Sequence, residues 1–279
     1  MLNKLMKYEL KATARVVLPT FLGLLLFSII ARFSVGELLR APSALPAGGL
    51  LGFLRMLPQL GILLYILAVM AVGVVVLVVI IQRFYKNLTG DEGYLMFTLP
   101  VRPWQLVWSK LLVAALWQLL SAAAIVASLA ILLLQGEIAI RLPQLLGEFW
   151  QGLRPFLPAN TPLICLLWVL AGLAGTLANT MLIYAAIAVG HTIKNHRVMG
   201  SVLSYFALTT VLQLVSAPLA PLMAGPLMKM DLDTPAGVAR FTHEMLLYSP
   251  LLALALSAVM LAGFTYLTNQ IFQKQLNLE

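Results

Sequence analysis

Charged residues are scarce in this chain: Asp, Glu, Lys and Arg make up 10% of its 279 residues, whereas soluble globular domains carry about 25%. Apolar residues reach 61%, and the mean hydropathy is +0.96. So few polar side chains cannot cover the surface of a water-soluble body of this size. The composition therefore argues against a soluble enzyme, a nucleic-acid-binding domain and a disordered tail.

Several reactive groups are missing as well. Cysteine occurs once, as Cys165, which excludes an intrachain disulfide. This residue lies in an apolar run without a basic neighbour, so we expect it to pack in the core. His191 and His196 have no carboxylate or thiol beside them, so we expect solvated loop histidines and no metal site. No G-x-x-x-x-G-K-[ST] motif occurs, and we expect the chain to be no ATPase and no enzyme on its own.

Long runs without charge are abundant. A helix needs about 20 apolar residues to cross a bilayer, and six stretches between charged residues are candidates. The first, residues 16–31, is the shortest, and Arg32 can snorkel from its end. The six stretches predict spans at about 16–33, 60–82, 107–134, 162–190, 198–216 and 245–268. The sequence thus predicts a single all-α transmembrane domain over residues 1–279. The proline-rich but apolar segment 216–228 is a candidate re-entrant segment, because bare loop is not tolerated in lipid.

The distribution of Lys and Arg predicts the orientation of these spans. With the N-terminus in the cytoplasm, eleven of the 18 basic residues fall in cytoplasmic segments, as the positive-inside rule requires. Both termini are therefore predicted to be cytoplasmic. The net charge of +8 then needs no nucleic-acid partner. A cleaved signal peptide is disfavoured, because Glu9 interrupts the basic N-terminal region.

The predicted spans contain no Asp, Glu or His, and their two basic residues, Arg32 and Lys110, lie near the span ends. Ionisable residues at membrane depth usually mark ion paths and proton relays. Their absence weighs against an ion-coupled transporter, a pump and an intramembrane protease. Small residues recur at intervals of four and seven, which favours close helix packing or, alternatively, a protomer interface or conduit wall. These residues are Ala171, Gly175 and Asn179, and Ala114, Ser121 and Ser128.

The N-terminal segment is basic and amphipathic. Apolar residues recur at helical spacing from Leu2 to Leu10, and Lys4, Lys7 and Lys11 fall on the opposite side, with Arg15 following. This pattern predicts an interfacial helix over residues 1–14 on the inner membrane surface. A basic tail that only sets the topology is the alternative.

The loop between the second and third spans contains an unusual apolar cluster. Gly90 provides a stop for the preceding helix, and an acidic pair can cap a new short helix. Large apolar side chains in a cytoplasmic loop need cover, either from lipid headgroups or from a groove on a soluble partner. The predicted segment comprises Asp91, Glu92, Gly93, Tyr94, Leu95, Met96 and Phe97.

Two stretches resemble ABC-type permease subunits of Gram-positive bacteria. They are residues 4–15, KLMKYELKATAR, and residues 91–101, DEGYLMFTLPV. The resemblance implies the type-2 exporter fold, in which the N-terminal helix lies on the membrane and residues 91–97 form a coupling helix. That helix would bind a separate ATP-binding subunit, which holds ATP and Mg, while this chain binds no cofactor. It also implies a second permease chain, identical or different, and the bacterial cytoplasmic membrane.

The expected function is that of the permease subunit of a bacterial ABC exporter. Uncharged walls favour an amphipathic cargo, such as an antimicrobial peptide, a drug or a lipid-like molecule. The alternative is a membrane binding or scaffold protein that transports nothing, for instance a sensor or an immunity factor.

Overall fold

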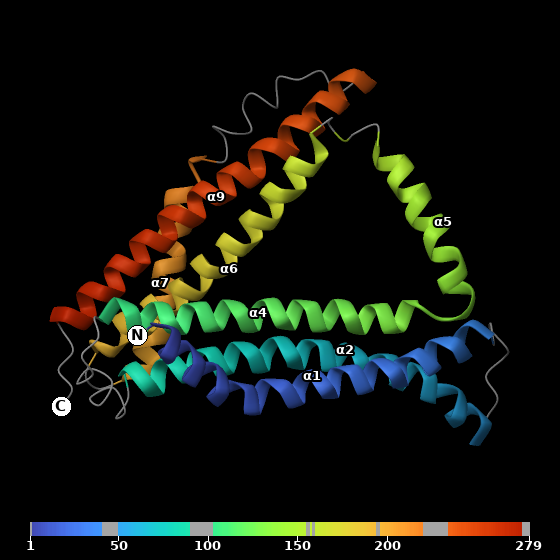
Figure 1. Cartoon of the computed structure of the whole chain (residues 1–279), viewed down its shortest axis with the longest axis horizontal. Coiled ribbons are helices and arrows are strands. Elements are labelled where there is room, and N and C mark those ends of the chain that lie inside the picture. Colours follow the sequence, from blue (N-terminus) through green and yellow to red (C-terminus); the bar gives the residue numbers. More distant parts are fainter. Residues whose placement is uncertain are drawn as a thin grey trace. The chain divides into compact units, whose positions relative to one another are not determined.

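The computed structural model describes residues 2–40, 50–89, 103–154, 157, 160–193, 196–219 and 234–274, and all regular structure in these ranges is helical. The helices are α1 (Leu2–Arg40), α2 (Leu50–Phe84), the π-helix η1 (Tyr85–Thr89), α4 (Pro103–Leu133), α5 (Gly136–Leu153), α6 (Thr161–His191), α7 (Arg197–Ser216) and α9 (Pro235–Lys274) (Figure 1). The predicted all-α class is confirmed. Most of the predicted re-entrant segment, residues 220–228, lies outside the described residues, as do residues 91–97.

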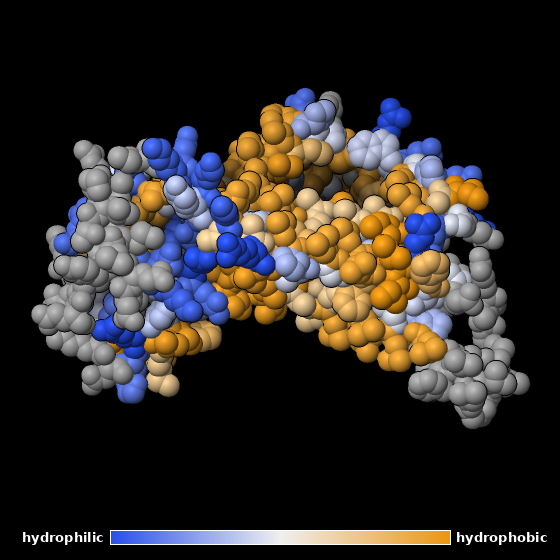
Figure 2. Space-filling model, turned by 60° about the horizontal axis from the view of Figure 1, so that its bottom comes forward, coloured by the Kyte–Doolittle hydropathy of each residue, from blue (hydrophilic) through white to orange (hydrophobic). Residues whose placement is uncertain are grey.

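Six helices are long and apolar enough to cross a membrane, namely α1, α2 continued by η1, α4, α6, α7 and α9. Each of the six predicted spans falls on one of them. The chain is therefore a multi-pass membrane protein. Its surface agrees with this, since α7 leaves Leu203, Phe206 and Leu214 more than 60% exposed, and Figure 2 shows hydrophobic side chains over much of the visible surface.

Cys165 corrects one expectation. It is exposed on α6 and does not pack in a core. In a membrane protein the hydrocarbon of the bilayer is as apolar as a protein core, so an apolar run does not by itself indicate burial within the protein.

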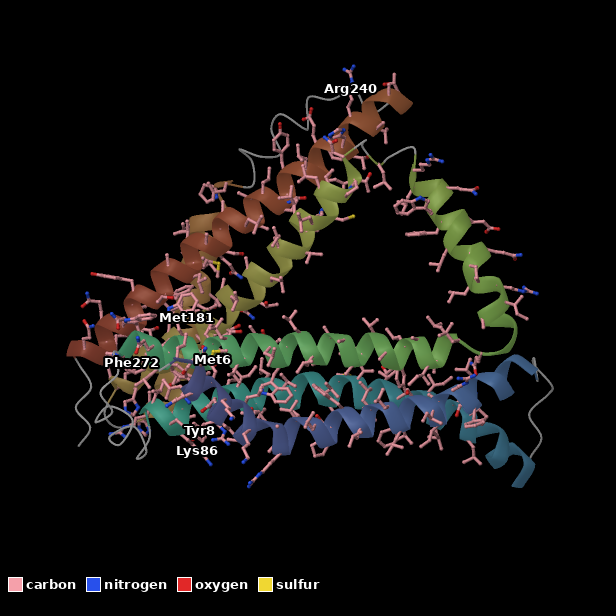
Figure 3. All side chains as sticks on the ribbon, in the orientation of Figure 1. Met6, Tyr8, Lys86, Met181, Arg240 and Phe272 are labelled. Atoms are coloured by element: carbon pink, nitrogen blue, oxygen red, sulfur yellow. The ribbon has the colours of Figure 1, made fainter. Side chains whose placement is uncertain are left out.

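The chain divides into two compact units, which are described separately. Unit 1 comprises Met1–Met6, Ile81–Ala115 and Gln151–Glu279, and unit 2 comprises Lys7–Ile80 and Leu116–Trp150. In unit 1, α6 packs along both α7 and α9. Arg240 and Phe272 mark opposite ends of α9 (Figure 3).

Two polar contacts join the long helices of unit 2. The hydroxyls of Tyr65 on α2 and Ser128 on α4 are 3.0 Å apart. Trp117 Nε1 on α4 donates a hydrogen bond of 2.7 Å to Thr13 Oγ1 on α1. Such contacts between membrane helices contribute about 0.6 kcal/mol each. Ser128, one of the small residues spaced at seven, therefore serves helix packing.

Helix α1 runs without interruption from Leu2 to Arg40. The predicted interfacial segment and the first span are thus continuous in the structure. The burial of Thr13 against Trp117 shows that the bundle already begins within the last turn of the segment that the sequence assigns to the membrane surface.

Helix α5 was not predicted. The proline-containing stretch between the third and fourth spans reads as a loop in the sequence, but it forms 18 residues of helix with Pro143 inside. Gly136, with a φ of +46°, allows the chain to turn after α4, a conformation that glycine adopts without strain. Apolar residues at intervals of three and four support the helix in spite of the backbone hydrogen bond that Pro143 cannot donate.

Candidate functional site

The predicted partner-binding segment, Asp91 to Phe97, lies outside the described residues, but the structure describes both of its flanks. The π-helix η1 precedes it and α4 follows it from Pro103. The four basic residues of the predicted membrane-surface helix are spread along α1 rather than gathered into a pocket. All four are exposed, namely Lys4, Lys7, Lys11 and Arg15.

Four helix ends meet in unit 1 beside these flanks, at a cluster we call the junction. Phe84 at the end of α2 stacks on Tyr184 of α6, with ring centroids 3.9 Å apart and planes 10° apart. Phe272 of α9 lies 6.1 Å from Phe84, centroid to centroid. The Tyr184 hydroxyl donates a long hydrogen bond of 3.5 Å to the backbone carbonyl of Lys110 in α4. The junction thus connects α2, α4, α6 and α9.

The π-helix after Phe84 carries the chain from the junction toward the undescribed segment. Asn87, Leu88 and Thr89 are buried, and Thr89 Oγ1 donates a hydrogen bond of 2.8 Å to the Tyr85 carbonyl. Single-turn π-helices are uncommon and recur at functional sites. Residues 84–89 therefore give the segment at 91–97 a firmly packed attachment on one side.

A second close contact joins α6 to α7 near the same end of α6. A Cβ placed on Gly200 would lie 2.8 Å from the carbonyl oxygen of Gly190, and a Cβ on Gly190 would collide with the backbone nitrogen of Ser201. Only glycine permits this approach of two backbones. Gly190 and Gly200 therefore fix the spacing of α6 and α7 where the short connection between them turns.

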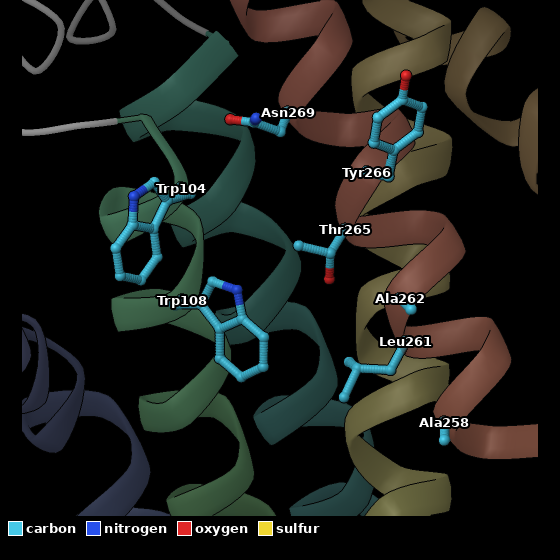
Figure 4. Close-up of a pocket in the computed structure, with 8 residues that line it drawn as sticks. All are labelled: Trp104, Trp108, Ala258, Leu261, Ala262, Thr265, Tyr266 and Asn269. Atoms are coloured by element: carbon cyan, nitrogen blue, oxygen red, sulfur yellow. The ribbon is translucent and has the colours of Figure 1, made fainter. Parts of the chain in front are cut away.

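A cleft of about 430 Å³ opens between α4 and α9 within unit 1 (Figure 4). Trp104 and Trp108 of α4 form one wall. The residues of α9 that line it share one face of that helix; they are Ala258, Leu261, Ala262, Thr265, Tyr266 and Asn269. The small residues leave room for a ligand between the indole rings and α9. Apolar walls with a few polar groups are typical of ligand-binding clefts.

Two polar atoms on the α9 wall lack partners. Thr265 Oγ1 and Asn269 Oδ1 are buried and make no hydrogen bond to any residue that the structure describes, and Figure 4 shows both side chains on the side of α9 that faces α4. Tyr266, in contrast, accepts a hydrogen bond of 3.0 Å from Gln270 Nε2. An unsatisfied buried acceptor costs about 1–3 kcal/mol. A ligand with a hydrogen-bond donor would recover this free energy.

Sequence reasoning missed this cleft. The available signal was the spacing of Ala258, Ala262, Thr265 and Asn269, which places small and polar residues on one stripe of an otherwise apolar helix. Within the described ranges, no three His, Cys, Asp or Glu side chains lie close enough to hold a metal ion.

Comparison with known proteins adds no family to this description: no protein-family model, no curated protein and no solved structure matches the chain.

Proposed function

We propose that this chain is the permease subunit of a bacterial ABC exporter, acting with a separate ATP-binding subunit and a second permease chain. Its cargo would be amphipathic, such as an antimicrobial peptide, a drug or a lipid-like molecule. The observation that carries the proposal is the junction of Phe84, Lys110, Tyr184 and Phe272, which links the flanks of the 91–97 segment to two further spans.

The junction provides a physical route for coupling. Phe84 lies seven positions before Asp91, and η1 between them is buried. Protein interiors are close-packed and transmit displacement instead of absorbing it. A partner that binds residues 91–97 and moves them would therefore displace α2 and α4, and through the aromatic stack also α6 and α9.

In this proposal ATP and Mg bind only to the partner, since the sequence contains no phosphate-binding loop. The exposed basic residues of α1, from Lys4 to Arg15, would contact anionic lipid of the inner leaflet. The cleft between α4 and α9 would contact the cargo. Its indole rings suit an apolar portion, and Thr265 and Asn269 suit a hydrogen-bonding group.

The deciding experiment is purification of the full chain from its native membrane in mild detergent, followed by mass spectrometry. We expect an ATP-binding subunit to co-purify in a fixed ratio and the complex to hydrolyse ATP, whereas the isolated chain does not. A chain that binds a peptide or lipid but carries no ATPase in any membrane preparation would favour the scaffold or sensor alternative.

A further inference from the structure

Helix α5 has two chemically different faces. Polar residues recur at intervals of three and four, from Arg141 through Gln144 and Glu148 to Gln151. Large apolar residues occupy the other face at the same spacing; they are Leu142, Leu145, Leu146, Phe149 and Leu153, with Trp150 at the edge. This is the amphipathic pattern of a helix that buries one side only.

The apolar face of α5 has no partner within the described residues of unit 2. Leu145 is 55% exposed, Leu146 57%, Phe149 65% and Trp150 55%. In water this would be the kind of large apolar patch that marks an interaction surface. Lipid or another protein surface must therefore cover this face.

The chain fixes α5 to the membrane at both ends. The preceding span, α4, ends at Leu133, three residues before Gly136, and the next span, α6, begins at Thr161, eight residues after Leu153. At 1.5 Å per residue, 18 residues of helix are about 27 Å long. If α5 stood upright, it would carry its apolar face well beyond the bilayer surface. If it lies flat, both ends remain at the level of the span ends.

The charges on α5 also indicate which kind of lipid or protein surface can cover its apolar face. Glu137 and Glu148 balance Arg141 and Arg154, which directly follows the helix. The segment 136–154 thus has no net charge with which to attract anionic lipid or a strongly charged protein. Its binding would depend on apolar area, and Trp150 at the edge is the residue type found at the boundary of hydrocarbon and headgroups.

We propose that α5 is an interfacial helix that lies in the lipid headgroup region, on the side of the membrane opposite both termini, with Leu142, Leu145, Leu146 and Phe149 in the acyl chains. This proposal does not depend on the proposed transport function.

The test uses the full chain with Cys165→Ala and one cysteine on α5, labelled with an environment-sensitive fluorophore and reconstituted into phosphatidylcholine vesicles. Leu146→Cys reports the apolar face, and Gln144→Cys is the matched control on the polar face. Lipids with a nitroxide on the acyl chain should quench the label at 146 at least about twofold more than the label at 144, because only the apolar face is immersed. Aqueous iodide should show the reverse preference.

Added phosphatidylglycerol and added salt should leave this difference unchanged, because the segment 136–154 carries no net charge. Strong iodide quenching at 146 would overturn the proposal by placing the face in water. An apolar emission spectrum at 146 without nitroxide quenching would also overturn it, since a second copy of the chain or another protein would then cover the face. If the 146 variant does not fold, Phe149→Cys and Gln151→Cys provide an equivalent pair.

Discussion

At the scale of single residues, the α4–α9 cleft is built at a cost in stability. Asn269 Oδ1 is buried without a hydrogen-bond partner among the described residues, so a leucine, which branches at the same carbon, loses no bond there. We expect Asn269→Leu to unfold at or above the temperature of the parent, with a gain of up to about 1–3 kcal/mol. Thermal unfolding in detergent measures this, and a clear loss of stability would show that Asn269 has a partner within the protein.

Tyr65→Phe is the matched control for that substitution, because it also removes one polar atom from a span. Tyr65 does have a partner, the Ser128 hydroxyl at 3.0 Å, and its loss should lower stability by about 0.6 kcal/mol. Opposite signs for the two substitutions would identify the cleft as a place where polar groups are held for a ligand.

The glycines of α6 provide a second comparison. We expect Gly190→Ala to destabilise the protein by about 1–3 kcal/mol, because the new methyl group overpacks against Ser201 of α7. Gly172→Ala should be neutral or stabilising, since no atom lies within 4 Å of its Cβ position and alanine favours helix by about 1 kcal/mol. Unfolding of both variants by denaturant tests this, and equal effects would contradict the close approach of α6 and α7.

At the scale of elements, the 91–97 segment carries the proposed partner contact. We expect the double substitution of Tyr94 and Phe97 by Ala to weaken ATPase binding about 30-fold or more, because buried aromatic anchors contribute about 2 kcal/mol or more. Asp91→Ala should cost only the capping contribution of about 1 kcal/mol. Co-purification of the double variant at parental affinity, with export intact, would exclude the coupling role.

Phe206→Ala is the control for that experiment. Phe206 is an aromatic residue on the exposed face of α7, with 62% exposure, and the substitution changes a span surface without touching the junction or the loop. It should keep the ATPase and insert normally. A comparable loss of partner binding in this variant would mean that the assay reports general instability.

The elements differ in how far the sequence could predict them. The six spans follow from charge-free runs, since a bilayer tolerates few alternatives. Helix α5 could not be predicted in this way, because Pro143 and the short apolar runs around it are typical of a loop. What indicates the helix is the spacing of its apolar residues, since their number is too small to mark a span. The cleft could not be predicted either: it depends on residues about 150 positions apart, Trp108 and Ala258, coming together, and no local pattern encodes that contact.

At the scale of the whole molecule, the orientation remains to be tested. Asn87 is buried in η1 and is a poor site for a labelling reagent, whereas Lys7 and Glu148 are exposed. In a Cys165→Ala background, an impermeant maleimide applied to intact cells should label Glu148→Cys and reach Lys7→Cys only after lysis. The reverse order would invert the topology predicted by the basic residues.

The reactivity of the exposed Cys165 can report how deeply its part of α6 lies in the bilayer. This thiol is the only one in the sequence and lies on α6 four residues after Thr161, which is about 6 Å along the helix. The rate at which Cys165 reacts should therefore depend on how strongly a reagent partitions from water into the bilayer. A lipid-soluble maleimide should modify it faster than a charged one, because only the former enters the bilayer. The ratio of the two rates would measure how deeply α6 sits in the bilayer, without any change to the protein.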